Sequence, residues 1–91
     1  MYTLVWSPSF TRTAKRFVRL HPELRTRLAT ILQDLETDPF LPHLKLHSLR
    51  GQLEGKQAIS LTYDYRIILT VMLTDKEIIL LDIGSHDEVY R

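Results

Sequence analysis

The chain has 91 residues, of which 44% are hydrophobic and 25% are charged, a composition typical of one globular domain with a single core. The absence of cysteine excludes disulfides and thiolate metal sites, and no apolar run is long enough to cross a membrane. We therefore expect a single domain over residues 1–91 that works in the cytoplasm.

The net charge of +1 is unevenly distributed. Residues 1–33 contain six basic residues and one acidic residue, whereas residues 34–91 contain six basic and ten acidic residues. A basic segment of this kind is usually a solvated helix face, and the alternative is a surface for RNA or for an acidic protein. Charge alone favours the solvated face.

The first half of the chain predicts one strand and two helices. Residues 2–6 alternate and are rich in β-formers, which indicates a strand. Ser7 and Pro8 suit the N-cap and first position of a helix, in which apolar residues recur at helical spacing from Phe10 to Val18. Pro22 ends this helix and begins a second amphipathic one, which ends before Pro39. The short connection favours an antiparallel helical hairpin.

The second half predicts three strands after an irregular segment. In residues 44–50 the leucines should anchor the chain and leave Lys45, His47 and Arg50 free to point elsewhere. Residues 56–62 alternate like a strand, and residues 66–73 are almost continuously apolar, like a strand buried on both faces. Residues 74–77 should form a hairpin turn, and residues 78–83 should form a last strand that breaks at Gly84.

The element order β-α-α-β-β-β predicts an α+β fold. We expect the helical hairpin to pack on one face of a four-stranded, mainly antiparallel sheet. The first strand should join the sheet at its edge or beside the last strand. The opposite face should be partly uncovered, and Ser60 and Arg66 are candidates to lie on it.

Two histidines are candidates for proton transfer, because imidazole titrates near neutral pH. A lone loop histidine such as His47 is more often a solvated polar residue. His86 directly follows a buried strand, so a rigid base would present its side chain, although it could equally be a turn histidine that satisfies the backbone. His43 and His47 lie four residues apart without a helical pattern or a third ligand, so we expect no metal and no cofactor.

Asp64, Tyr65 and Arg66 open the long apolar strand. An arginine at this position is unfavourable to bury alone, so it should either form an ion pair or clamp an anion with its planar guanidinium. Tyr65 and Tyr90 could stack on a base or cap the core, and for an isolated tyrosine the core is favoured. The candidate partners for an ion pair of Arg66 are Asp64, Asp82 and Asp87.

Three segments in sequence carry a resemblance to a known family: His-Ser-Leu-Arg-Gly at residues 47–51, Asp-Tyr-Arg-Ile-Ile at 64–68, and Ile-Gly-Ser-His-Asp-Glu-Val-Tyr at 83–90. Together with the element order, they resemble the RelE/ParE superfamily of bacterial type II toxins, and within it the YafQ-like ribosome-dependent mRNA interferases. The resemblance covers essentially the whole chain. It implies a toxin that a cognate antitoxin protein holds inactive in a hetero-oligomer and that, once free, cuts mRNA in the ribosomal A site, with no membrane partner.

The resemblance also implies how an endoribonuclease of this kind works. The ribose 2′-hydroxyl attacks the adjacent phosphate, with His47 and His86 as general base and general acid in an order left open, and with Arg66 stabilising the charge. Asp64 and Tyr90 complete the catalytic set. The residues expected to contact RNA are Tyr65, Arg50, Lys45 and Ser60.

Two departures from the family pattern leave alternatives open. Ser60 stands where YafQ-like members carry histidine and RelE-like members carry lysine, and residues 86–88 replace a basic cluster of the RelE-like members. One alternative is a ParE-like toxin that poisons DNA gyrase and cleaves nothing. The other is a degenerate, non-toxic member that only binds an antitoxin.

Overall fold

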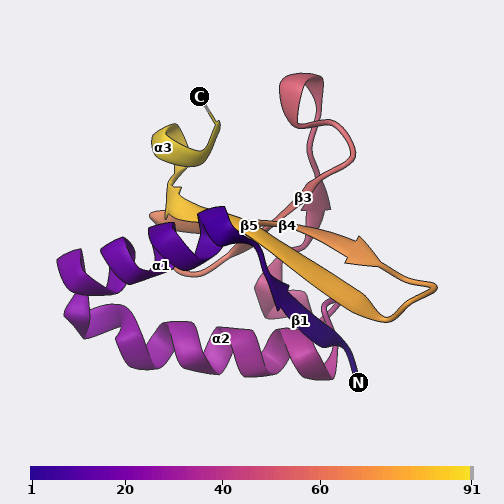
Figure 1. Cartoon of the computed structure of the whole chain (residues 1–91), viewed down its shortest axis with the longest axis horizontal. Helices are drawn as coiled ribbons and strands as arrows, with labels where there is room; N and C mark the ends of the chain where they lie inside the picture. Colours follow the sequence, from indigo (N-terminus) through magenta and orange to yellow (C-terminus); the bar gives the residue numbers. More distant parts are fainter. Residues whose placement is uncertain (91) are drawn as a thin grey trace.

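The computed structural model describes residues 1–90, and it confirms the predicted α+β architecture. A layer of two helices covers one face of a single sheet (Figure 1). The helices are α1 (Pro8–Leu20), α2 (Arg25–Thr37) and α3 (His86–Tyr90), and the strands are β1 (Thr3–Trp6), β2 (His47–Ser48), β3 (Gln57–Ser60), β4 (Tyr65–Met72) and β5 (Glu77–Ser85). Short 3₁₀ turns occur at η1 (Pro22–Leu24), η2 (Pro42–Leu44) and η3 (Gly51–Leu53).

The sheet has the strand order β1-β5-β4-β3-β2. β1 runs parallel to β5, and the other neighbours are antiparallel, so β1 lies at the edge and beside the last strand, as predicted. The sheet has five strands where we expected four. The additional strand, β2, is only two residues long and exists through its pairing with β3, so no local periodicity marks it in the sequence.

Local sequence explains where α1 begins. Ser7 is its N-cap, and the Ser7 hydroxyl accepts a hydrogen bond from the backbone N–H of Phe10 at 3.0 Å. Pro8 follows at the first helical position, where a missing N–H leaves no helical hydrogen bond unmade. The helix buries Phe10, Ala14 and Phe17, three of the residues that the predicted helical spacing placed on one face.

The main core lies between the helices and the sheet. Residues at alternate positions of the central strands point into it, among them Ile67 and Leu69 on β4, which are 0% exposed. From the helices come Phe10, Ala14, Phe17, Leu28, Ile31 and Leu35. The packing of the helices on this face fixes the sheet, whose opposite face carries the candidate site.

The second face of the sheet carries a smaller cluster. Ala58, Ile68 and Val89 are buried there, and Leu49, Leu81 and Tyr90 pack against them. α3 therefore rests on the face opposite to α1 and α2, as Figure 1 shows. The face that we expected to be partly uncovered is thus partly covered by α3 and by the segment around η3.

The predicted break at Gly84 is wrong, because β5 continues through Gly84 to Ser85 and α3 follows directly. The glycine serves close packing instead of a turn. A Cβ atom at Gly84 would lie 3.1 Å from Oε1 and 3.3 Å from Cβ of Glu88. Its missing side chain therefore lets α3 fold back tightly onto the end of β5.

A β-bulge in β5 precedes this fold-back. Ile68 on β4 pairs with Asp82, whereas the next residue, Leu69, pairs with Leu80, so Leu81 is the extra residue. The Ser9 hydroxyl on α1 donates a hydrogen bond to the Leu81 carbonyl at 2.6 Å. Because bulges increase strand twist, this one turns the end of β5 that carries α3.

Among residues 1–90, no helix has the length and apolarity that crossing a membrane requires.

Candidate nucleic-acid interface

A concavity lies on the second face of the sheet, between α3 and the segment around η3. Its volume is about 390 Å³, and it is lined by Leu49, Arg50, Gln52, Leu53, His86 and Tyr90. Figure 1 shows the two segments standing on the sheet opposite to the helical layer. Three of the predicted site residues, Arg50, His86 and Tyr90, therefore meet although up to 40 positions separate them in the chain.

His86 and Tyr90 form the α3 side of this concavity. Their rings contact each other edge to face, with centroids 4.3 Å apart and an interplanar angle of 71°. Tyr90 is half-buried against the second cluster, whereas the His86 side chain is 69% exposed. The carboxylate of Asp87 lies 3.6 Å from Nδ1 of His86. Tyr90 thus forms a wall beside an imidazole that solvent and a ligand can reach.

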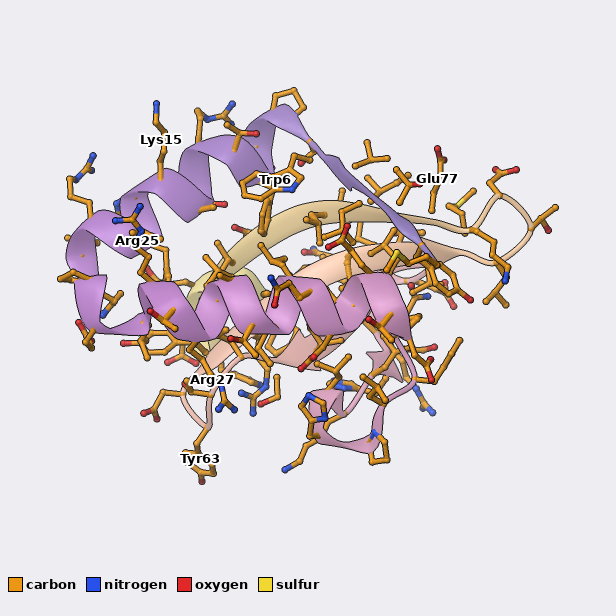
Figure 2. All side chains as sticks on the ribbon, turned by 90° about the horizontal axis from the view of Figure 1, so that it is seen from below. Trp6, Lys15, Arg25, Arg27, Tyr63 and Glu77 are labelled. Carbon is orange, nitrogen blue, oxygen red and sulfur yellow. The ribbon has the colours of Figure 1, made fainter. Side chains whose placement is uncertain are left out.

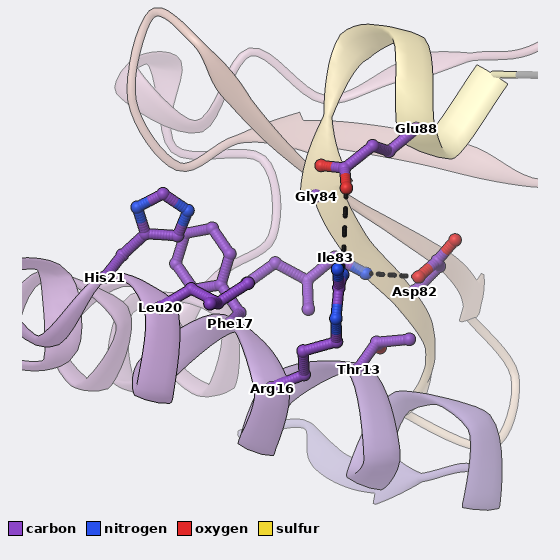
Figure 3. A pocket seen from close by; sticks show the side chains of 9 residues that line it. All are labelled: Thr13, Arg16, Phe17, Leu20, His21, Asp82, Ile83, Gly84 and Glu88. Atoms are coloured by element: carbon purple, nitrogen blue, oxygen red, sulfur yellow. Dashed lines mark hydrogen bonds and ion pairs between the residues drawn. The ribbon is translucent and has the colours of Figure 1, made fainter.

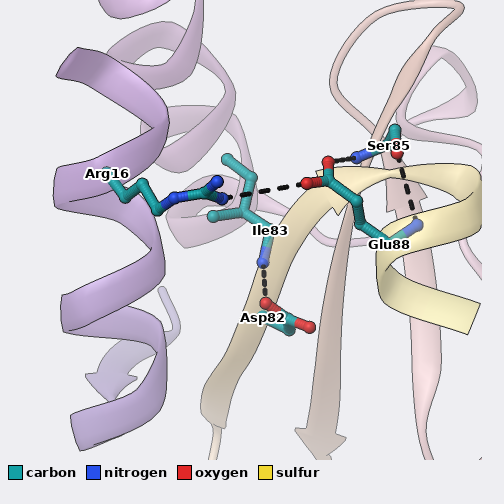
Figure 4. Close-up of polar contacts among 5 residues, drawn as sticks. All are labelled: Arg16, Asp82, Ile83, Ser85 and Glu88. Atoms are coloured by element: carbon teal, nitrogen blue, oxygen red, sulfur yellow. Dashed lines mark hydrogen bonds and ion pairs between the residues drawn. The ribbon is translucent and has the colours of Figure 1, made fainter. Parts of the chain in front are cut away.

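Sequence reasoning missed α3, although a signal for it was present. Ser85 and Glu88 form a capping box: the Ser85 N–H donates to Glu88 Oε1 at 2.9 Å, and the Glu88 N–H donates to Ser85 Oγ at 3.3 Å (Figure 4). This Ser-x-x-Glu pattern is a known start signal for helices. The helix escaped notice because one turn is too short to show a helical period.

Arg66 lies in a row of residues that crosses the second face. It pairs with Ser60 on β3 and with Gly84 on β5, two positions before His86. Its Nη1 donates hydrogen bonds to the carbonyl oxygens of Thr62, Tyr63 and Tyr65, at 2.8, 2.9 and 3.1 Å. Within residues 1–90, neither Nε nor Nη2 of Arg66 has a hydrogen-bond partner. Half of the guanidinium is therefore anchored, and the other half is available to an anion.

The structure does not bear out an ion pair of Arg66 with an aspartate. Within the described residues, the guanidinium contacts only neutral carbonyl groups. Asp64 is exposed in the turn between β3 and β4, Asp82 accepts a hydrogen bond from the N–H of Ile83 at 2.8 Å, and Asp87 lies beside His86. Among residues 1–90, no carboxylate pairs with the positive charge of Arg66.

Tyr65 lies on the other side of the sheet from Arg66. Its ring contacts Phe17 edge to face, with centroids 5.1 Å apart, and His21 at 4.9 Å. It packs against the main core, as the core interpretation of this tyrosine expected. The predicted contact of Tyr65 with RNA therefore does not fit this position, because adjacent strand residues face opposite sides of a sheet.

His47 and Lys45 lie outside the concavity of His86. His47 lines a separate concavity of about 350 Å³, together with the apolar side chains of Phe40, Leu46, Val71 and Leu73. Its Nδ1 is 2.9 Å from the carbonyl oxygen of Lys45, an exposed residue in the left-handed conformation (φ 54°). The expectation that His47 and His86 share one pocket is not met, since no residue lines both concavities.

A cation that sequence reasoning missed adjoins the concavity of His86. Lys56 lines a neighbouring hollow of about 280 Å³ with Ile68, Asp82 and Leu53, and Leu53 also lines the first concavity. With Arg50 and Arg66, it gives the second face three cations. Lys56 stands at the start of a strand pattern, where a lysine is unremarkable, so the sequence held no signal for it.

The helical layer has a hollow and a basic surface of its own. The hollow, of about 140 Å³, lies between α1 and β5, and its polar lining residues are Thr13, Arg16, His21, Asp82 and Glu88 (Figure 3). The basic residues of α1 and α2 are exposed, and Lys15 and Arg25 extend from the helices in Figure 2. The interpretation of these cations as a solvated helix face is consistent with this exposure.

The described residues contain no cluster of three or more histidine, aspartate or glutamate side chains that could hold a metal ion. His43 and His47 do not act together, because Nε2 of His43 contacts Oδ2 of Asp34 at 2.8 Å while His47 contacts Lys45. The site as described offers histidine, tyrosine and arginine side chains for acid–base and electrostatic chemistry.

Comparison with solved structures identifies the fold. YafQ from E. coli strain BL21(DE3) superposes with a TM-score of 0.83 and 17% identity, over 100% of both chains. A metal-bound toxin from Helicobacter pylori gives a TM-score of 0.81 and 26% identity, over 99% of this chain and 100% of that one. The chain has the RelE-like toxin fold.

The RelE-like fold is also present in the crystal structure of the E. coli DinJ–YafQ complex, which matches with a TM-score of 0.72 and 20% identity over 100% of both chains. The structural neighbours therefore confirm the expected resemblance to YafQ and to YoeB/ParE toxins at the level of the fold. No family model matches the sequence, and no curated protein matches it. The RelE-like fold was thus recognisable from three short segments although overall identity is low.

Proposed function

We propose that this protein is the toxin of a toxin–antitoxin pair and that it cleaves mRNA on the ribosome without a metal ion. The observation that carries the proposal is the concavity in which Arg50, His86 and Tyr90 meet, on the same face of the sheet as Arg66, whose guanidinium is held at the β3–β4 turn. An imidazole and an uncompensated guanidinium are the two groups that phosphodiester cleavage by an internal nucleophile needs most. The similarity to YafQ and to other toxins supports the same conclusion.

In the proposed reaction, His86 takes the proton of a ribose 2′-hydroxyl. The 2′-oxygen then forms a bond to the adjacent phosphorus, and the bond from phosphorus to the 5′-oxygen breaks. The departing oxygen takes its proton from water, which reaches the exposed rim of the concavity. The products are a 2′,3′-cyclic phosphate and a free 5′-hydroxyl.

Arg66 and Arg50 supply the positive charge for this reaction. The fixed guanidinium of Arg66 is aimed by its three carbonyl contacts and can donate its remaining N–H groups to the phosphorane oxygens. A preorganised donor of this kind typically contributes about 10²–10³-fold to the rate. General base catalysis contributes about 10²–10⁴-fold. Arg50 and Lys56 are placed to hold the neighbouring phosphates.

The proposed partner is a cognate antitoxin protein. YafQ with DinJ, and YoeB from Staphylococcus aureus with YefM, form complexes that share this fold in one of their chains. We infer a corresponding hetero-oligomer for this chain. A toxin of this kind must be neutralised in the cell that makes it, so co-expression with its cognate antitoxin should restore growth.

A second candidate function is a ParE-like toxin that poisons DNA gyrase without cleaving RNA. The observation that favours it is the separation of His47 and His86 into different concavities. A YoeB/ParE toxin from Agrobacterium tumefaciens has the same fold as this chain and matches it with a TM-score of 0.76. The two candidates predict different damage in a cell.

Induced expression in E. coli distinguishes these functions. The ribonuclease proposal predicts rapid arrest of translation and new mRNA 5′ ends with a hydroxyl group at fixed positions within codons. Purified protein should produce the same ends on ribosome-bound mRNA. Filamentation with intact mRNA would support the gyrase poison instead, and normal growth would contradict both.

A further inference from the structure

α3 carries His86 and Tyr90, yet it is only five residues long. A single helical turn is unstable alone in water, because nucleation of a helix is unfavourable. Val89 is the one side chain of α3 that is buried, at 6% exposure. The direction in which the His86 imidazole leaves the sheet therefore depends on the contacts that hold this turn to β5.

Glu88 makes the contacts that close the turn. Its Oε1 accepts the hydrogen bond of the Ser85 N–H, and its own N–H donates to the Ser85 hydroxyl (Figure 4). This reciprocal pair fixes the conformation at the N-cap. Because His86 directly follows Ser85, the same pair fixes the backbone from which the imidazole extends.

Glu88 also joins α3 to the helical layer. Its Oε2 lies 3.8 Å from Nη1 of Arg16 on α1, and both side chains line the hollow between α1 and β5 (Figure 3). The two side chains are 62% and 51% exposed, and exposed ion pairs of this kind contribute little. The hydrogen bond between the Ser85 N–H and the Glu88 carboxylate therefore contributes more to the position of α3 than the ion pair with Arg16 does. The absence of a side chain at Gly84 leaves room for the Glu88 side chain.

We propose that Glu88 is a positioning residue for the RNA-cleaving site: its carboxylate holds α3 in the orientation that presents His86 and Tyr90 to the phosphate. The inference rests on the proposed function. Glu88 lines the hollow beside α1, whereas His86 and Tyr90 line the concavity with Arg50, so Glu88 acts on the site through α3 and not by touching RNA.

Three variants of the full chain test this role. Glu88→Ala removes the side-chain half of the capping box and keeps the bond from the residue 88 N–H to the Ser85 hydroxyl. Glu88→Gln keeps an acceptor for the Ser85 N–H but loses the charge toward Arg16, and Asp75→Ala removes a carboxylate from the exposed β4–β5 turn as a control. Loss of a capping contact shifts a helix equilibrium by about 2- to 30-fold. We expect Glu88→Ala to lower kcat about tenfold with little change in KM. Glu88→Gln and Asp75→Ala should stay within about twofold of the unmodified protein.

An NMR measurement reads the position of α3 without relying on activity. The nuclear Overhauser contacts between the His86 and Tyr90 rings should persist in Glu88→Gln and Asp75→Ala and weaken strongly in Glu88→Ala, while the core resonances of all variants stay in place. Unchanged ring contacts in Glu88→Ala, or a loss of kcat in Glu88→Gln as large as in Glu88→Ala, would overturn the positioning role. If the unmodified protein cleaves no RNA, the proposed function fails, and the ring contacts still decide whether Glu88 holds α3.

Discussion

Ser60 and Arg66 face each other across β3 and β4, and both donate a hydrogen bond to the carbonyl oxygen of Thr62, at 3.0 and 2.8 Å. The turn that connects the two strands is therefore held by one side chain from each of them. This arrangement gives Ser60 a structural role in the turn. It also orients the guanidinium of Arg66 before any RNA is bound.

Replacing Arg66 should lower the rate of cleavage strongly and the stability of the fold only slightly. Arg66→Gln removes the positive charge from the second face, and we expect the rate of mRNA cleavage to fall about 10²–10³-fold. Loss of the carbonyl contacts should lower the free energy of unfolding by about 1–2 kcal/mol. Cleavage assays on ribosome-bound mRNA and urea denaturation measure the two effects. Lys15→Gln, on the exposed side of α1, makes the same charge change away from the site and should alter neither.

Ser60→Ala should affect the turn more than the chemistry. The variant loses the hydrogen bond to the Thr62 carbonyl, which Arg66 still contacts, so the free energy of unfolding should fall by about 0.5–1.5 kcal/mol. The cleavage rate should remain within about threefold, because Ser60 transfers no proton in the proposed reaction. A drop in rate comparable to that of a His86 variant would show that the hydroxyl takes part in catalysis.

The two histidines should differ in their importance. His86 shares a concavity with Arg50 and Tyr90, whereas His47 lines another one, so His86→Ala should slow cleavage by about 10²–10⁴-fold and His47→Ala by less than tenfold. Single-turnover cleavage of a ribosome-bound message measures both rates. Equal and large losses would mean that the β2 segment moves toward α3 when RNA binds.

The stability of the fold should depend on the layer between helices and sheet. Leu35 on α2 is 0% exposed, so Leu35→Ala should lower the free energy of unfolding by about 2–5 kcal/mol through lost burial and the cavity that remains. Leu20 at the end of α1 is 54% exposed, and Leu20→Ala should change it by less than about 0.5 kcal/mol. Denaturant titrations followed by circular dichroism compare the two variants directly.

The sequence predicted the architecture well because its long elements carry strong periodic signals. The apolar spacing from Phe10 to Phe17 and the cap at Ser7 led to the observed α1. Pro22, predicted to begin the second helix, begins a 3₁₀ turn instead, and α2 follows from Arg25. Position within the sheet was also predictable for β1, since a strand that precedes a helical hairpin must return to the sheet at an edge. What these elements share is that local sequence determines them.

The missing elements are those that tertiary contacts determine. β2 consists of His47 and Ser48 and takes its conformation from β3, and α3 is a single turn. Gly84 suggested a break because glycine often marks a turn, whereas here it makes room for Glu88. The Ser85–Glu88 capping box was legible in the sequence and would have predicted α3 had it been weighed against the glycine.

The sequence predicted only part of the candidate site, because the site also depends on contacts between distant segments of the chain. Arg50, His86 and Tyr90 converge, but this depends on the long-range contact between η3 and α3, which no local pattern reveals. The position of Tyr65 was predictable, since a strand that places Arg66 on one face must place Tyr65 on the other. The register of β2, which becomes visible only in the folded chain, pairs His47 with Ala58 of the second face, yet His47 lines a different concavity from His86.

The place of β5 between β1 and β4 has a consequence for how this chain folds. Thr3 aligns with Glu77, so β1 gains its neighbour in the sheet from a strand 74 positions further along the chain. Contacts this distant along a polypeptide slow folding. Because β5 also leads into α3, a chain cut short before β5 would have neither a partner for β1 nor the helix that carries His86 and Tyr90.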